Sequence, residues 1–537
     1  MKRTLGSRRV AVLLLTAAIG VFALGALAMP AAARQDSGFK TSQAAMLDPV
    51  VFGATVEPLI TVGETLPGST YKFESIPDGI ALRKGHGNSV EAYVNHETST
   101  VPFPFTPQTG VGFNDFTNAM LSKLTLSRKT AGILSGSYVI PSEANFHRFC
   151  SNFIADHKHG FERPLLFANE EATDFVNRTG NSWPGTPGEQ AGVVVAYDLT
   201  TGAYKAIYGM GRHNHENSVA LEGYGHPVIL SGDDTFSAPA SQMYMYTARN
   251  ANAVWNDEGS LWAFVSDDPA TNDYGDLTGA ESVSGRFIPV PRPVALGSQS
   301  ALESWSNANN VFQFIRVEDI AYDRKDENVV YFADTGEPRA KPDATTGRLR
   351  RDSTGGGPYP NGRMFKMVLD RRDPTIVSSL SILIDGDAMG SAGAGNVNLI
   401  HQPDNVETTK DLLLIQEDPG SQNQYPLGTG TTARVWAYEL ATGALYPVAR
   451  VNQSADEGPT DRDADPTRAR AGAWESSGIV DASKFFGKGA FLLDVQAGSL
   501  VIEEEKRGTL TYQREGGQVL LLRLPKRAGG GDDVDDD

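Results

Sequence analysis

The chain contains 537 residues, of which 65 are acidic and 47 are Lys or Arg, giving a formal net charge of −18 at pH 7. This excess of negative charge disfavours binding to nucleic acid and to anionic lipid, and it favours hard cations as partners. Cys150 is the single cysteine, so no intramolecular disulfide can form. A buried or bound thiol is expected instead.

Residues 1–33 have the features of an export signal. A basic start, from Lys2 to Arg9, precedes an almost wholly apolar run, from Val10 to Ala28, and small alanines follow at 31–33. The Ser7-Arg8-Arg9 triplet is similar to a twin-arginine signal but lacks the usual Phe-Leu-Lys continuation, so the twin-arginine and general secretory routes both stay open. An uncleaved membrane anchor is the alternative. We expect a periplasmic or secreted protein with no membrane contact after signal removal.

Two segments, 192–203 and 433–444, repeat one pattern. Their sequences, GVVVAYDLTTGA and ARVWAYELATGA, place alternating apolar residues before an acidic-Leu-x-Thr-Gly turn. Glycine supplies the positive φ that closes such a hairpin. Similar hairpins fit residues 243–246 with 261–264, and residues 363–368. The chain is therefore expected to consist largely of short antiparallel strands.

A second pattern recurs six times, in which a polar or acidic group precedes a short strand pair that ends in another acidic group. The units are 77–80 with 95–97, 150 with 169–171, 215–217 with 232–234, 318–320 with 334, 404–406 with 417–418, and 475–478 with 494. The spacing within each unit is enough for two strands and a turn. The six units predict an all-β, six-bladed β-propeller with long inserted loops at residues 34–527, followed by a disordered acidic tail at 528–537.

The innermost strand of each propeller blade lines the central channel, so side chains at the same place in every repeat point toward one axis. Carboxylates collected there raise one another's pKa values unless a cation neutralises them, so the repetition predicts a metal site. The alternative for any single pair is that acids and Asn cap turns at strand ends. Calcium suits the oxygen ligands, whereas Cys150 and His215 are softer and suit a transition metal.

Three long segments interrupt the pattern, at 248–311, 336–362 and 452–473. The second could bring positive charge to an anionic substrate, or it is simply a solvated loop; its cations are Arg339, Lys341, Arg348, Arg350 and Arg351. The third contains an alternation from Asp461 to Asp465 that lacks the glycine and distal glutamate of a calcium loop. The sequence has no Gly-x-Ser-x-Gly elbow, Gly-rich phosphate loop or His-Glu-x-x-His helix, so hydrolysis by metal-activated water is the simplest chemistry.

Several short motifs, taken in order, resemble those of the PhoX-type alkaline phosphatases. They are Asn95-His96-Glu97, Cys150 followed by Glu170-Glu171, Gly211-Arg212 leading to His215-Glu216, Gly232-Asp233-Asp234, Arg316-Val317-Glu318-Asp319-Ile320-Ala321, and Asp404-Asn405. The resemblance extends from about Asp78 to Asp494. It implies a six-bladed propeller, exported by the twin-arginine route, that hydrolyses phosphate esters at a cluster of calcium and iron with one cysteine ligand.

The resemblance also implies which residues carry the chemistry. Cys150 with a neighbouring acid such as Glu171 would hold iron, and other acids would hold calcium or bridge the metals: Glu97, Glu216, Glu318, Asp404 and Glu475. Further candidate ligands in the same units are Glu170, Asp233, Asn405 and Glu417. Arg316 is the candidate phosphate-orienting residue, because guanidinium matches phosphate oxygens bidentately; surface pairing with an acid is its alternative. The surroundings of Cys150 (Phe149 to Phe153) differ from the family's usual Asn-Cys-Ala-Gly-Gly.

Two other functions fit part of the pattern. A calcium-dependent lactonase-like or phytase-like propeller hydrolase shares the Pro-Asp-Gly, Glu-Asp-Ile and Pro-Asp-Asn turns, but it would not use Cys150. A non-enzymatic envelope protein would bind calcium only for rigidity. If the chain is a phosphatase, its expected partner is a small-molecule phosphate ester, and we expect it to act as a monomer.

Overall fold

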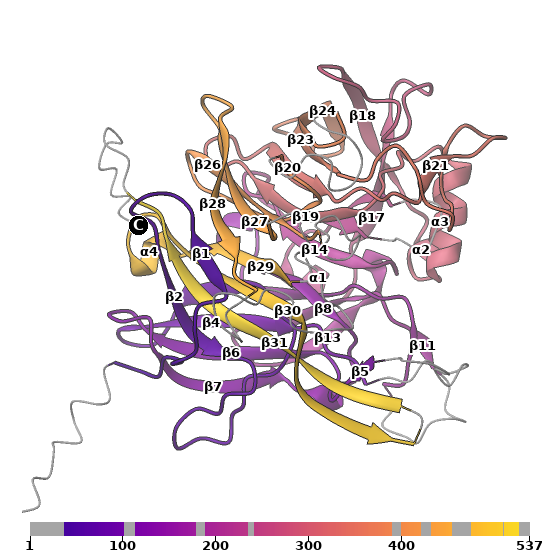
Figure 1. Ribbon diagram of the computed structural model, residues 1–537. Coiled ribbons are helices and arrows are strands. Elements are labelled where there is room, and N and C mark those ends of the chain that lie inside the picture. The colour runs from indigo at the N-terminus through magenta and orange to yellow at the C-terminus, as the bar shows by residue number, and fades with distance from the viewer. Residues whose placement is uncertain are drawn as a thin grey trace, which may run out of the picture.

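The computed structural model describes residues 37–100, 113–178, 188–234, 241–388, 399–419, 431–453, 474–508 and 510–525. Within these residues the chain is mainly antiparallel strand (Figure 1). Six inner strands form a closed ring, and the other strands of each blade pair in order from them; the third and fourth blades are joined in one nine-stranded sheet. The predicted all-β, six-bladed propeller is confirmed. No helix among the described residues is long and apolar enough to cross a membrane. The predicted signal peptide and acidic tail lie outside these residues.

The first three blades span residues 77–289. The first contains β3 (Pro77–Lys84), β4 (Ser89–His96), β6 (Met120–Ser127) and β7 (Ile133–Ile140). The second contains β8 (Phe149–Ala155), β9 (Leu165–Glu170), β12 (Val194–Asp198) and β13 (Tyr204–Ile207). The third contains β14 (His215–Ala220), β15 (Val228–Asp233), β16 (Met243–Thr247), β17 (Ser260–Ser266) and β18 (Ser282–Pro289).

The other three blades complete the ring. The fourth contains β19 (Val317–Tyr322), β20 (Val329–Asp334), β23 (Arg363–Leu369) and β24 (Ile376–Asp385). The fifth contains β25 (Pro403–Thr408), β26 (Leu412–Glu417), β27 (Arg434–Glu439), β28 (Leu445–Val451) and β1 (Leu47–Pro49). The sixth contains β29 (Trp474–Asp481), β30 (Ala490–Arg507), β31 (Leu510–Arg523) and β2 (Thr55–Thr61).

Strands from the N-terminal part of the chain close the ring. β1 is the outermost strand of the fifth blade and β2 that of the sixth, paired antiparallel with β28 and β31. The first blade therefore follows directly from a strand that belongs to the last one, which ties the two ends of the propeller together. The hairpins predicted from the repeated sequences are confirmed as β12–β13 and β27–β28.

The remaining elements lie between the blades or extend them. The short strands are β5 (Phe113–Asp115), β10 (Phe175–Val176), β11 (Glu189–Gln190), β21 (Ala340–Pro342) and β22 (Leu349–Arg351). The helices are η2 (Ser142–Ala144), η3 (His157–His159), η4 (Tyr208–Met210), α1 (Ala251–Trp255), α2 (Arg292–Ala295), α3 (Gln299–Ala308) and α4 (Ser483–Phe486). The expectation that 248–311 interrupts a blade is wrong in part. β17 and β18 extend the third blade, and β18 pairs with β24 of the fourth.

Side chains on each strand alternate between the two neighbouring blades. On β4, Val90, Ala92 and Val94 pack in a cluster with residues of the sixth blade, whereas Tyr93 packs with residues of the second. This period of two is what an extended strand imposes, and burying each aliphatic side chain contributes about 1.5–3 kcal/mol. Blade-to-blade packing therefore holds the inner strands at fixed positions around the axis.

Candidate metal centre

The six innermost strands present potential metal ligands at one equivalent place. β3, β8, β14, β19, β25 and β29 lie side by side around the axis, each in contact with the next, and β29 returns to β3. The second residue of each strand carries a carboxyl or thiol group: Asp78, Cys150, Glu216, Glu318, Asp404 and Glu475. Repetition of one backbone position in all six blades therefore gathers these groups at one end of the channel.

A break in the strand pairing accompanies this position. The register shifts between the first and fourth residues of the inner strand in the first five blades, for example between Pro77 and Ile80 and between Phe149 and Asn152. In the sixth blade the shift lies slightly later, between Ser477 and Val480. Such bulges bend a strand and redirect a side chain, and they recur next to functional sites. They explain how neighbouring side chains at the strand start can turn toward the axis.

A second set of acids comes from the residue that follows the second strand of a blade. Glu97, Glu171, Asp234 and Asp418 occupy this place in four blades. In the fourth blade it is Thr335, whose hydroxyl donates to Glu318 Oε1 at 2.5 Å. The acids of the second set thus lie beside those of the inner strands.

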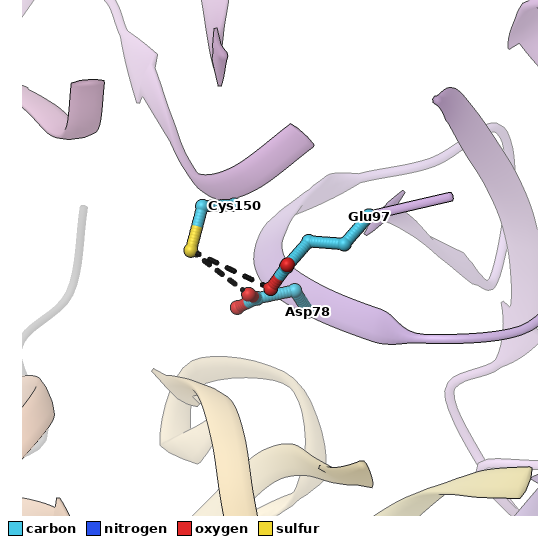
Figure 2. Close-up of side chains that lie close together, drawn as sticks. All are labelled: Asp78, Glu97 and Cys150. Carbon is cyan, nitrogen blue, oxygen red and sulfur yellow. Dashed lines mark hydrogen bonds between the residues drawn. The ribbon is translucent and has the colours of Figure 1, made fainter. Parts of the chain in front are cut away.

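Nine of these side chains form four overlapping groups, and within each group the ligand atoms all lie within 4.8 Å of one another. The groups are Asp78–Glu97–Cys150, Cys150–Glu171–Glu216, Glu216–Glu318–Asp404 and Asp404–Asp418–Glu475. Each group shares one residue with the next, so the nine side chains form one continuous arc, which we call the acidic arc. Figure 2 shows its first group, with the thiol of Cys150 directed at the carboxyls of Asp78 and Glu97.

Cys150 is the junction between two of the groups. Its Sγ lies 3.0 Å from Asp78 Oδ2, 3.0 Å from Glu216 Oε1 and 3.7 Å from Glu97 Oε1. A thiol has one proton and can satisfy only one carboxylate at a time. The arrangement therefore suits a thiolate and carboxylates that share a cation better than it suits a hydrogen-bonded thiol.

Burial and crowding perturb the titration of the acidic arc. The pKa values of Glu97, Glu216, Glu318 and Asp404 are raised well above their usual range, first by burial and then by neighbouring carboxylates, although Arg316 opposes the rise at Glu318. The same causes raise the pKa values of Glu171 and Glu475 and of the Cys150 thiol. Each shift means that the charged form is unfavourable in the protein alone. A bound cation would remove that penalty, so the donor set fits a metal cluster.

A layer of small polar side chains supports the arc. Ser477 Oγ lies 2.6 Å from Asp78 Oδ1 and 2.7 Å from Asn405 Oδ1, and Asn405 donates to Ser151 Oγ at 2.9 Å. Ser151 in turn donates to Glu216 Oε1 at 3.2 Å. The structure therefore places Asn405, expected as a ligand, as a link between side chains that hold the acids. Gln496 completes the support by donating to Asp78 Oδ2 and Glu97 Oε1.

Arg316 lies next to the arc, but its guanidinium binds acids. Nε and Nη2 donate to the two oxygens of Asp234 at 2.7 Å each, and Nη2 lies 3.1 Å from Glu318 Oε1. The side chain is buried, so this is not the surface pairing that was the alternative. Burial disfavours the charged form, but the charges of Asp234 and Glu318 outweigh it and raise the pKa of Arg316. Arg316 thus fixes two acids at the edge of the arc.

Three predicted ligands face into the blades instead. Glu170 accepts the backbone N–H groups of His147 and Val193 and pairs with Arg178. Glu417 accepts the backbone N–H of His401 at 2.9 Å and the Trp436 Nε1–H at 2.8 Å, and it pairs with Arg434. Asp233 ends β15, and its Oδ1 lies 3.7 Å from His213 Nδ1. Each of these acids is the last residue of the second strand of its blade, and its side chain contacts the segment before the inner strand. None of the three is a member of the four groups.

The two histidines near the third blade are also buried away from the arc. His215 contacts Ser231 Oγ at 2.8 Å and the carbonyl of Gly211 at 3.1 Å, and its ring lies 3.6 Å from that of His213. Burial lowers the pKa of His215 to about 4 and lowers that of His213 well below the usual value. Both rings are therefore neutral at ordinary pH. The expected soft nitrogen ligand at His215 is not among the four groups.

The predicted cationic segment 336–362 forms the β21–β22 hairpin. Arg339 is bound bidentately by Glu337, Lys341 pairs with Asp352, and Arg348 donates to Gln313. The pKa values of Arg348 and Arg351 are both lowered, first by burial and then by neighbouring arginines. The alternation from Asp461 to Asp465 lies outside the described residues.

With this geometry established, the chain can be compared with known proteins. The family model of alkaline phosphatase PhoX matches residues 167–468, more than half of the chain. The chain belongs to the PhoX alkaline phosphatase family. A search of curated proteins gave no match.

One solved structure among those similar to the chain supports this fold. Pseudomonas fluorescens PhoX in complex with vanadate, a transition state analogue, is 16% identical with a TM-score of 0.60, over 91% of this chain and 98% of that chain. A protein of unknown function from Dyadobacter fermentans is 11% identical with a TM-score of 0.38, over 87% of this chain and 99% of that chain. The PhoX family assignment makes the protein a metal-dependent hydrolase of phosphoric ester bonds, as the sequence motifs predicted.

Proposed function

We propose that the acidic arc binds calcium and iron together and that this PhoX-family enzyme hydrolyses small phosphate esters there. The observation that carries the proposal is the set of four overlapping ligand groups, in which a single thiol joins two groups and the rest supply oxygen alone. A site for one ion would need only one such group. Shared ligands between successive groups are what a cluster of several ions requires.

The chemistry of the donors assigns ions to the groups. Cys150 belongs to the groups with Asp78 and Glu97 and with Glu171 and Glu216. Thiolate is a soft ligand that suits iron, so we assign iron to these two groups. The other two groups, which run from Glu216 to Glu475, contain carboxylates only, and carboxylate oxygen suits calcium.

Metal ions held in this way would bind the phosphoryl oxygens, offset their developing charge and lower the pKa of bound water. The chain's own residues supply position and polarity. The polar layer of Ser151, Asn405 and Ser477 holds Asp78 and Glu216 in place by hydrogen bonds. In our proposal Arg316, the expected phosphate-orienting residue, acts first by holding Asp234 and Glu318, since two of its nitrogen atoms already bind Asp234.

Export belongs to the same proposal. An exported phosphatase agrees with the family, and the signal-like segment at residues 1–33 would direct the chain to the periplasm or the medium. The Ser7-Arg8-Arg9 triplet is similar to a twin-arginine signal, so we assign export to that route, which carries folded proteins. Replacing Arg8 and Arg9 by Lys while following the location of the enzyme tests the route. Unchanged export would contradict twin-arginine transport.

The test of the metal assignment is elemental analysis of protein purified through its own export route, combined with hydrolysis of p-nitrophenyl phosphate. We expect calcium and iron together, and turnover that falls on calcium chelation and returns on calcium addition. Calcium alone with full turnover would contradict the iron assignment. The absence of both metals from an active enzyme would overturn the proposal.

A further inference from the structure

Arg148 lies two residues before Cys150, immediately before β8, and its backbone is strained. Its φ is +46°, in the left-handed region that residues other than glycine rarely adopt. Its carbonyl accepts the backbone N–H of Glu171 at 2.9 Å. The strained residue is thus fastened directly to one proposed ligand and lies close in sequence to another. Ile76 and Gln402 have the same positive φ and the same kind of backbone bond two residues before Asp78 and Asp404, so this conformation belongs to the blade pattern and places the Arg148 backbone beside the acidic arc.

The side chain of Arg148 lies within electrostatic reach of four carboxyls without pairing with any of them. The charges of Glu97, Glu171, Asp115 and Asp174 all act on its guanidinium. No hydrogen bond or ion pair joins that guanidinium to a described residue, and the residue is exposed. A cation that faces acids across a gap leaves room for a negatively charged group between them.

Other arginines beside buried acids behave differently. Arg316 binds Asp234 bidentately, Arg178 pairs with Glu170 and Glu189, and Arg434 pairs with Glu417. These arginines are buried or half-buried, and each is already paired with the carboxylates beside it. Arg148 therefore combines proximity to the acidic arc with an exposed residue surface and a guanidinium that pairs with none of the described carboxylates.

We propose that Arg148 binds the phosphoryl group of the substrate at the edge of the acidic arc, beside Glu97 and Glu171. This inference rests on the proposed function, since it requires the phosphate ester to bind at the arc. Guanidinium presents paired N–H groups that match two phosphoryl oxygens, and such charge-assisted pairs are among the stronger hydrogen bonds. The alternative is that Arg148 only offsets the negative charge of the neighbouring acids.

The test compares Arg148→Gln, Arg148→Lys and the wild type after loading with calcium and iron. Arg128→Gln is the control, because Arg128 is an exposed arginine on the turn between β6 and β7. For Arg148→Gln we expect the KM for p-nitrophenyl phosphate and the inhibition constant of inorganic phosphate to rise together by about 10- to 100-fold, with unchanged metal content. Arg148→Lys keeps the charge and should recover part of the loss.

Different failures have different meanings. An active wild type whose phosphate inhibition is unaltered by Arg148→Gln overturns the inference and leaves the proposed function standing. A change that follows the metal content of the variant also overturns it, because a charge-balancing residue would behave in this way. A metal-loaded wild type that hydrolyses no phosphate ester overturns the proposed function itself.

A measurement on the unaltered enzyme covers the case in which the variants do not fold. Phenylglyoxal modifies accessible arginines, and mass spectrometry can follow each modified peptide. We expect inorganic phosphate to protect Arg148 while leaving the modification of Arg128 unchanged. Equal modification of Arg148 with and without phosphate would contradict its contact with the phosphoryl group.

Discussion

Removal of metal from this protein should make its stability depend steeply on pH. In the folded, metal-free chain the pKa values of six carboxyls of the acidic arc are raised, mainly by burial: Glu97, Glu171, Glu216, Glu318, Asp404 and Glu475. The folded state therefore holds protons that the unfolded chain has released. Stability is therefore fully present below the unfolded pKa of the carboxyls, near pH 4, and falls as pH rises toward their folded values. Bound metal keeps the carboxyls ionised and removes this dependence.

The size of the effect follows from linkage. Each proton held in excess by the folded state lowers the free energy of unfolding by about 1.4 kcal/mol per pH unit. If two of the six acids keep their protons between pH 6 and pH 8, the loss is about 5–6 kcal/mol, which is comparable with the whole stability of a typical domain. Chelated protein should thus be close to unfolding at pH 8 and distinctly more stable at pH 5.

Scanning calorimetry of chelated and metal-loaded protein at several pH values from 5 to 8 tests this. The difference in melting temperature between the two forms should grow with pH. Glu216→Gln removes one titrating acid and should reduce the slope of the chelated form by up to about 1.4 kcal/mol per pH unit. Glu327→Gln, on the turn between β19 and β20, is the matched control. A difference in melting temperature that is constant with pH would refute the reasoning.

Three substitutions test other parts of the site. Cys150→Ser exchanges a soft ligand for a hard one, so iron content should fall, calcium should remain and kcat should drop more than about 100-fold; full turnover with p-nitrophenyl phosphate would exclude a thiolate ligand. Glu417→Gln breaks the buried pair with Arg434 and should cost about 3–5 kcal/mol in thermal denaturation while folded enzyme keeps its kcat, whereas Asp418→Asn should lose kcat without that destabilisation. Identical behaviour of these two variants would contradict their different placement. In Gly79→Ala the new Cβ would meet the backbone N of Asn152 at 2.4 Å, so both melting temperature and kcat should fall; an unchanged kcat would show that the spacing of β3 and β8 does not control the arc.

The fold was predictable because its signal is local and repeated. Each unit begins an inner strand, and five of the six end its partner strand, so short segments such as 77–80 and 404–406 mark the blade starts in the sequence itself. The closure of the ring was not predictable in the same way. β1 and β2 pair with strands near the other end of the chain, at Val451 and Arg523, and no local pattern encodes a partner so distant in sequence.

The candidate site was harder to predict, because three units contain two adjacent acids at the end of the second strand. Adjacent residues of an extended strand point to opposite sides, so one acid of each pair faces the arc and the other faces the blade. Composition does not distinguish them, which is why Glu170 and Glu417 were expected as ligands and Asp418 was not. The pairing register of the inner strands shows which of the two acids lies beside the arc.

In every blade the second residue of the inner strand has the equivalent place, and in the first five blades the last residue of the second strand lies opposite the first residue of the inner strand. Because Phe149 pairs with Glu170 and Pro403 pairs with Glu417, the acid one position later is the one beside Cys150 or Asp404. The same rule assigns Asp78, Glu97 and Asp234 to the axis, and it assigns Thr335 to the place where the fourth blade has no acid. Register, rather than the identity of the residues, decides which carboxylates can share a metal.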